Sequence, residues 1–84
     1  MGNMRSKEEI IGWIQKTIAN ELHVDVAAVP PHAKFTELGA DSVALIALAG
    51  DLEEWLGQTV LPSMLWDHPT LEALAAELSR VSAQ

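Results

Sequence analysis

Apolar residues recur every three or four positions over the first part of the chain, a spacing typical of an amphipathic helix. Between residues 7 and 22 they share one face, while polar residues such as Gln15 and Lys16 occupy the other. Ser6 precedes this pattern and Glu9 lies three residues later, which is the spacing of a capping box. We therefore predict a first helix over residues 7–22. Its apolar face consists of Ile10, Ile11, Trp13, Ile14, Ile18 and Leu22.

The helical period is lost between His23 and Ala40, where Pro30 and Pro31 prevent a helix from continuing. A connection of this length is unusual in a small domain, so its own apolar residues must hold it against the core. The candidates are Val24, Val26, Val29, Phe35 and Leu38. Such a long loop also allows the second helix to run roughly parallel to the first.

A second helix is predicted from Asp41 or Ser42 to Leu56, with Gly57 as its C-terminal stop. Steps of 100° per residue place an apolar arc toward the core, flanked by Ile46 and Trp55. That arc contains Leu45, Leu48, Ala49, Leu52 and Leu56. The opposite side is small or apolar where charge would be expected, and acidic only further along. It contains Val43, Ala47, Gly50, Asp51 and Glu54.

The last third of the chain predicts a short helical turn and then a longer helix. Val60 and Leu61 are expected to point inward, residues 63–66 to form one turn, and Thr70 to cap the last helix. Its buried stripe is Leu71, Leu74, Ala75, Leu78 and Val81. The predicted fold is all-α, a small four-helix bundle with a long loop after the first helix and a short third helix. The domain is expected over 6–81, between a disordered N-terminal tail (1–5) and a C-terminal tail (82–84).

Composition narrows the functional classes. The chain has 84 residues, 49% of them hydrophobic, and a formal net charge of -7, so we expect one folded domain. Its five scattered Lys and Arg residues, against twelve Asp and Glu, argue against nucleic-acid binding. Cysteine is absent, which excludes disulfides and thiolate metal sites. No stretch resembles a membrane span or a secretory signal, so no membrane association and a cytoplasmic location are expected.

The histidines do not suggest a metal site or a catalytic site. His23, His32 and His68 are far apart and lack the spacing of metal ligands. A triad of Ser42, Asp67 and His68 is disfavoured because adjacent Asp67 and His68 cannot easily orient each other. We therefore predict no metal and no catalytic residue.

The candidate chemistry lies at the start of the second helix. Gly39 can adopt unusual backbone angles, and Asp41 and Ser42 are both good helix-capping residues. The serine hydroxyl would lie at the positive end of a helix dipole, where phosphate is favoured. On these residues alone, two readings stay open. Ser42 is either a plain helix cap or the acceptor in a phosphoryl transfer that a partner enzyme catalyses.

Two motifs carry a resemblance to a known family. Residues 35–42, Phe-Thr-Glu-Leu-Gly-Ala-Asp-Ser, resemble the Phe-x-x-Leu-Gly-x-Asp-Ser motif of acyl carrier proteins. Residues 61–75 resemble the segment around the start of the last helix in carrier domains of modular polyketide synthases. The resemblance extends from Ser6 to Arg80. Residues 49–57 carry a weaker likeness to carriers that follow fatty-acyl-adenylate ligases.

The resemblance implies a non-catalytic carrier domain. Ser42 would be esterified by the 4′-phosphopantetheine of coenzyme A, whose thiol holds acyl or polyketide intermediates as thioesters. Asp41 would cap the helix near the metal of the transferase, and Gly39 would allow close approach. The implied partners are a phosphopantetheinyl transferase, an acyl-loading enzyme (an acyltransferase or a fatty-acyl-adenylate ligase), a ketosynthase and other synthase domains. The isolated domain is expected to be a monomer.

Partner contacts are expected to be apolar at the centre and acidic at the rim. The predicted partner-binding residues are Val43, Ala44, Ala47, Asp51, Glu54 and Met64. Two alternatives stay open, namely a peptidyl carrier domain and a helical protein-interaction module without a prosthetic group. Peptidyl carriers are less favoured because they usually have Gly-Gly-x-Ser where this chain has Gly-Ala-Asp-Ser.

Overall fold

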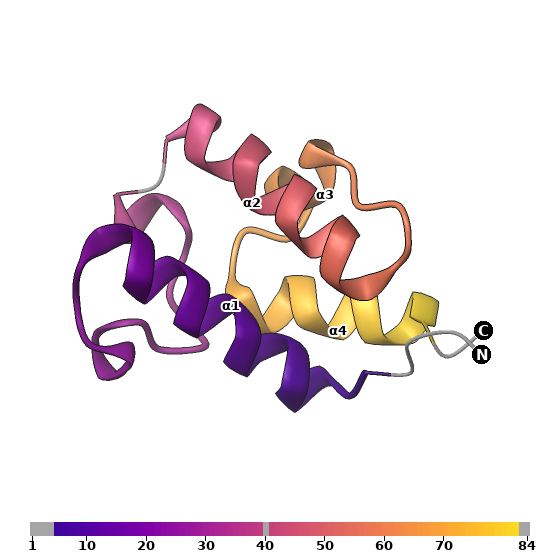
Figure 1. The fold of residues 1–84 in the computed structure, drawn as a ribbon, viewed down its shortest axis with the longest axis horizontal. Helices are drawn as coiled ribbons and strands as arrows, with labels where there is room; N and C mark the ends of the chain where they lie inside the picture. The colour runs from indigo at the N-terminus through magenta and orange to yellow at the C-terminus, as the bar shows by residue number, and fades with distance from the viewer. Residues whose placement is uncertain (1–4, 40, 83–84) are drawn as a thin grey trace.

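The computed structural model describes residues 5–39 and 41–82, which form four α-helices and two short 3-10 helices (Figure 1). In chain order these are α1 (Lys7–Leu22), η1 (Val26–Ala28), η2 (Thr36–Leu38), α2 (Ser42–Leu56), α3 (Pro62–Asp67) and α4 (Leu71–Ser82). The predicted all-α fold with a short third helix is confirmed. Most of the two expected tails lies outside the described residues, apart from Arg5 and from Ser82 in α4.

The capping box predicted at the start of α1 is present. The Ser6 hydroxyl accepts a hydrogen bond from the Glu9 N–H at 3.1 Å, and the Ser6 N–H donates to Glu9 Oε1 at 3.0 Å. The Ser6 N–H that donates to the Glu9 carboxylate holds the pKa of the Glu9 carboxyl below its usual value, together with the Ser6 side chain and the positive charge of Arg5. Because the fold favours the ionised form of Glu9, the contribution of this carboxylate to stability is present at neutral pH. It is lost as the pH falls through the lowered pKa.

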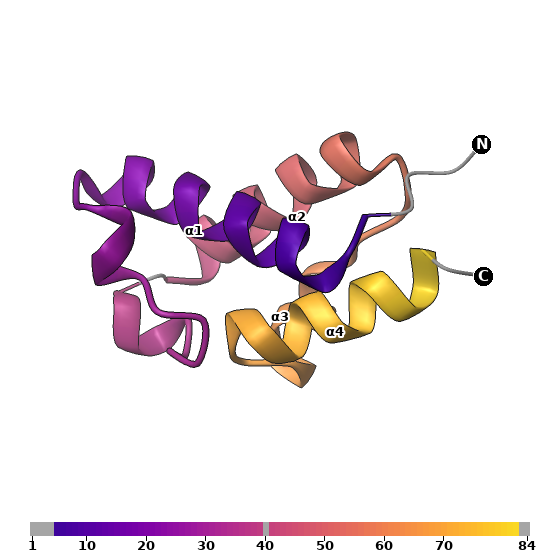
Figure 2. The ribbon, with the colours of Figure 1, turned by 90° about the horizontal axis from the view of Figure 1, so that it is seen from below.

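The helices are arranged so that α1 runs opposite to both α2 and α4, in both views (Figures 1 and 2). α1 packs mainly along α4, and the short α3 packs on α2. The first two long helices therefore do not take the parallel course that the long loop would allow. The loop folds back on itself, so that Leu22 and Gly39, at its two ends, line the same cleft with Ala44 of α2.

Most of the core comes from one apolar stripe on each long helix. All five residues predicted for the core face of α2 are buried: Leu45, Leu48, Ala49, Leu52 and Leu56. α1 contributes Ile10, Ile14, Ile18 and Ala19, and α4 contributes Leu71, Leu74, Ala75 and Leu78. The side chain of Val81, also predicted for this stripe, lies outside the described part of the chain. Leu22, predicted on the apolar face of α1, is exposed because α1 ends there.

Two of the three tryptophans join α1 to α2. The rings of Trp13 and Trp55 are stacked, with centroids 4.9 Å apart and planes 15° apart. The Arg5 guanidinium lies over the Trp55 ring at 4.3 Å, and Arg5 Nη1 is 3.7 Å from Glu9 Oε2. The third tryptophan, Trp66 of α3, is 51% exposed.

Fewer apolar residues hold the long loop than the sequence predicts. Val29 and Phe35 are buried and Leu38 packs partly against the core, whereas Val24 and Val26 are exposed. Leu61 was expected to point inward beside the buried Val60. It is the N-cap residue of α3, and its side chain is exposed.

Hydrogen bonds hold the loop where side chains do not. The Phe35 N–H donates to the Pro69 carbonyl and the Glu72 N–H donates to the Pro31 carbonyl, both at 2.9 Å. The Gln15 side chain donates to the Val29 carbonyl at 2.7 Å. The loop is thus joined both to α1 and to the segment before α4.

Replacing Phe35 tests how this loop is held. Phe35→Ala should lower the free energy of unfolding by about 3–5 kcal/mol, because it removes a buried aromatic ring from the core. The control Val26→Ala should change it by less than about 0.5 kcal/mol, since Val26 is exposed. Urea unfolding followed by circular dichroism measures both. Equal losses in the two variants would contradict this account.

Candidate functional site

Ser42 is the first residue of α2 and its side chain is exposed. Asp41 is the N-cap, and its Oδ1 accepts a hydrogen bond from the Ala44 N–H at 2.9 Å. That bond satisfies one of the orphan donors of the first turn, which leaves the N–H groups of Ser42 and Val43 without an intrahelical acceptor. The Ser42 hydroxyl has no hydrogen-bond partner among the described residues. The helix start therefore presents an accessible hydroxyl beside two outward donors, at the positive end of the dipole.

Gly39 ends η2 in the left-handed region, with φ of 84°. A Cβ added there would meet no atom within 4 Å, so the backbone angle rather than space within the chain favours glycine. The Gly39 N–H donates to the Thr36 carbonyl at 3.2 Å. This glycine lets the chain leave η2 in the direction that α2 requires.

The residues before Gly39 place η2 against the core. Phe35 is buried, Leu38 packs partly against the core, and the Lys34 N–H donates to Glu37 Oε1 at 2.8 Å. The motif at residues 35–42 thus combines apolar anchors, a left-handed glycine and a capping aspartate. Together they position the Ser42 hydroxyl.

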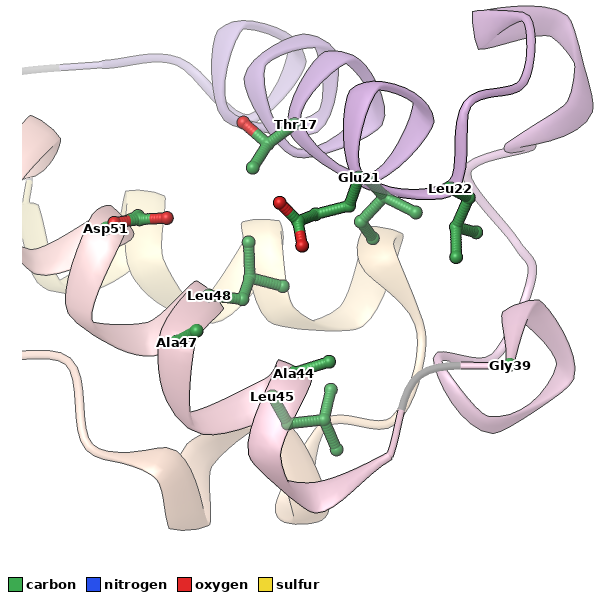
Figure 3. A pocket seen from close by; sticks show the side chains of 10 residues that line it. Thr17, Glu21, Leu22, Gly39, Ala44, Leu45, Ala47, Leu48 and Asp51 are labelled. Carbon is green, nitrogen blue, oxygen red and sulfur yellow. The ribbon is translucent and has the colours of Figure 1, made fainter.

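A cleft of about 140 Å³ lies between the second half of α1 and the first half of α2 (Figure 3). Ile18, Leu45 and Leu48 are its buried apolar residues, and Gly39 and Leu22 lie at the end nearer η2. Thr17 and Glu21 of α1 and Asp51 of α2 supply its oxygen atoms. The cleft could not be predicted from the sequence, because the pattern of neither helix alone determines how α1 approaches α2.

The six predicted partner-binding residues lie on two helices, five along one side of α2 and Met64 on α3. Ala44, Ala47 and Asp51 line the cleft beside α1. Val43 and Glu54 are exposed on α2, Val43 to 73%, and Met64 of α3 packs partly against the core. Three apolar residues that are more than half exposed were not predicted for partner binding: Ile46, Leu61 and Trp66. The sequence contained one signal for this apolar surface, which is that Ile46 flanks the core-facing arc of α2.

Other kinds of site find little support. Residues 5–39 and 41–82 contain no group of three or more His, Asp or Glu side chains that could hold a metal ion. Within the same described ranges, no helix has both the length and the apolar character needed to cross a membrane.

Residues 12–78 match the protein family described as "Phosphopantetheine attachment site". The chain belongs to this family. Its members carry a covalently attached 4′-phosphopantetheine, as the sequence predicted for the cofactor. Over 78 residues, or 93% of the chain, it is 32% identical to a phenolphthiocerol/phthiocerol polyketide synthase of Mycobacterium tuberculosis. The chain spans only 4% of that relative's length.

Solved carrier proteins share the fold. A free-standing peptidyl carrier protein from Acinetobacter baumannii is 34% identical, with a TM-score of 0.84 over 90% of this chain and 95% of that one. An acyl carrier protein from Anabaena is 32% identical, with a TM-score of 0.82 over 92% of this chain and 88% of that one. The predicted acyl-carrier-like bundle, with homology to polyketide synthase carrier domains, is confirmed.

The exposed Ser42 hydroxyl and the adjacent N–H groups fit the phosphodiester of this prosthetic group. A phosphate joined to the hydroxyl oxygen would lie at a helix N-terminus, where backbone donors and the helix dipole favour negative charge. Ser42 is not among the residues that line the cleft, so a phosphate attached to it would lie outside the cleft.

The backbone angle at Gly39 gives a test at this site. Gly39→Ala should cost roughly 1–2 kcal/mol of stability, because an L-residue is strained in the left-handed region. Gly50→Ala in the middle of α2, where an added Cβ also meets nothing within 4 Å, should instead stabilise by about 0.5–1 kcal/mol. Chemical unfolding of both variants should give opposite signs. A neutral Gly39→Ala would show that the angle is not required.

Proposed function

We propose that this chain is an acyl carrier domain of the polyketide-synthase type, with 4′-phosphopantetheine attached to Ser42. The observation that carries the proposal is the exposed Ser42 hydroxyl at the capped start of α2, inside the region that matches the family. Identity to a polyketide synthase over nearly the whole chain supports the pathway class. The domain is proposed to act without catalytic residues of its own, as a monomer, in the cytoplasm.

The residues around Ser42 have separate tasks in this proposal. Asp41 fixes the first turn of α2 through its bond to the Ala44 N–H, and its exposed carboxylate lies close to where the transferase would bring its metal. The N–H groups of Ser42 and Val43 are available to the phosphate. The prosthetic group, when bound, supplies a thiol that carries acyl groups as thioesters. Tethering raises the local concentration of the cargo at each partner's active site.

Partners are proposed to dock on an apolar face formed by Val43, Ile46, Leu61 and Trp66, which we call the α2–α3 face. Each of these side chains is at least half exposed, and the two helices pack on each other. Exposed aromatic and aliphatic side chains of this kind supply the desolvated centre of an interface. Asp51 and Glu54, also exposed on α2, would support encounter with basic partners. The partners are a phosphopantetheinyl transferase, an acyl-loading enzyme and a ketosynthase.

A second candidate function is that of a peptidyl carrier domain. The 34% identity to the peptidyl carrier protein from Acinetobacter baumannii favours it. The two functions use the same Ser42 attachment and differ in cargo. Loading of the modified domain by an adenylating enzyme specific for amino acids, and not by an acyltransferase, would select the peptidyl function.

Attachment at Ser42 is tested by intact mass. Incubation with coenzyme A and a permissive phosphopantetheinyl transferase should add the mass of one phosphopantetheine group, and Ser42→Ala should gain none. Ser63→Ala, which removes another exposed serine hydroxyl, is the matched control and should load like the parent. No mass gain in the parent, or a gain that survives Ser42→Ala, would refute the proposal.

The α2–α3 face is tested by removing apolar surface without adding charge. The double variant Val43→Gln, Ile46→Gln should lower the kcat/KM of the transferase about tenfold, the equivalent of about 1.4 kcal/mol of interface energy. Glutamine is a good helix former, so α2 should stay intact, which circular dichroism can check. Ala76→Gln on the exposed side of α4 is the control and should load at the parental rate. An unchanged rate for the double variant would place docking elsewhere.

A further inference from the structure

The cleft between α1 and α2 begins next to the proposed attachment residue. Ala44, only two positions after Ser42, lines it, as does Gly39. Asp51 also lines it, and the seven helical steps from Ala44 to Asp51 correspond to about 10 Å along a helix. Residues two positions apart lie on nearly opposite sides of a helix. A flexible group attached to Ser42 would therefore reach the cleft by passing over the exposed start of α2.

The cleft has a buried apolar floor and two exposed carboxylates among its lining residues. Leu45 and Leu48 are 4% and 6% exposed, and they form the apolar floor with Ile18. Figure 3 shows the Glu21 carboxylate reaching from α1 across the cleft toward α2. Neither Glu21 nor Asp51 forms an ion pair or a side-chain hydrogen bond with a described residue, so both can accept hydrogen bonds from a ligand.

The size of the cleft limits what it can hold. Its volume of about 140 Å³ is close to that of an apolar cavity of about 150 Å³ that takes one benzene molecule. A long acyl chain is much larger than this. The cleft therefore suits a compact, branched group with a few polar atoms, close to the point of attachment.

We propose, on the basis of the function proposed above, that this cleft holds the part of the phosphopantetheine arm nearest the phosphate. This part carries two methyl groups on one carbon, a hydroxyl and an amide N–H. The methyl groups match the Leu45 and Leu48 floor, and the hydroxyl and N–H are donors for the carboxylate of Glu21 or Asp51. The phosphate stays at the start of α2, away from the carboxylates that would repel it.

The placement has a consequence for the thiol and for docking. An arm held by its proximal part lies on the α1 side of α2. Its thiol end then extends beyond the cleft, and the α2–α3 face stays open to partners. A short acyl group could be thought to occupy the same cleft instead, and the experiment distinguishes the two occupants.

The experiment compares the unmodified and the modified domain by NMR, with complete loading verified by intact mass. With labelled protein and an unlabelled arm, the modified domain without acyl cargo should show NOEs from the arm's paired methyl groups to the methyl groups of Leu45 or Leu48. The amide resonances of Thr17, Glu21 and Leu48 should shift on modification. Ala47→Leu, which fills the cleft with a good helix former, should abolish these NOEs and shifts.

The controls separate the possible failures. Ala76→Leu, the same change at an exposed alanine of α4, should leave the NOEs unchanged, and Thr17→Leu fills the cleft from α1 if Ala47→Leu does not fold. Complete loading with shifts confined to residues 41–44 would overturn the cleft assignment alone. NOEs to Leu45 or Leu48 that arise only after acylation, and from the acyl group, would also overturn it. A parent that gains no mass would overturn both the cleft assignment and the proposed function.

Discussion

The hydrogen bond from the Phe35 N–H to the Pro69 carbonyl, with the burial of the Phe35 ring, determines where the second long helix can begin. It joins the loop to the segment that leads into α4, at a point far away in sequence. Once the loop is held there, η2 and Gly39 follow within four residues and direct the chain into α2. The position of the Ser42 hydroxyl thus depends on a contact made by a residue of the loop, not by the helix that presents it.

α2 is apolar around most of its circumference, and its sides have different surroundings in the structure. Its buried arc faces the core, and the start of one flank faces α1 across the cleft. The remaining side, at Val43 and Ile46, is exposed. An exposed apolar side has a cost in solubility that the acidic composition offsets, since a net charge of -7 keeps such domains apart. Under the proposed function, the same helix would serve packing, attachment and docking with separate residues.

Local patterns in the sequence predicted most of the fold, because helix periodicity and caps act within a few residues. The Ser6 and Thr70 caps, the five buried positions of α2 and the left-handed Gly57 are all present. The course of the loop could not be predicted in this way. Val24 and Val26 share the apolar character of Val29, and only the distant backbone partners of the loop decide which of them is buried. The antiparallel course of α1 and α2, and therefore the cleft, depends on the same long-range contacts.

The stacked rings of Trp13 and Trp55 have a mechanical consequence. They join α1 and α2 at one end of the pair, where Arg5 covers the Trp55 ring, while the cleft lies toward the other end, at Thr17 to Leu22 and Ala44 to Asp51. A stacked aromatic pair contributes about 0.5–1.5 kcal/mol beyond the area that it buries. If this contact is kept, the cleft can widen only by a rotation of one helix against the other about the indole pair. The separation of the two helices would then change most beside Ser42 and least at the two indole rings, which are fluorescent and mark the axis of rotation.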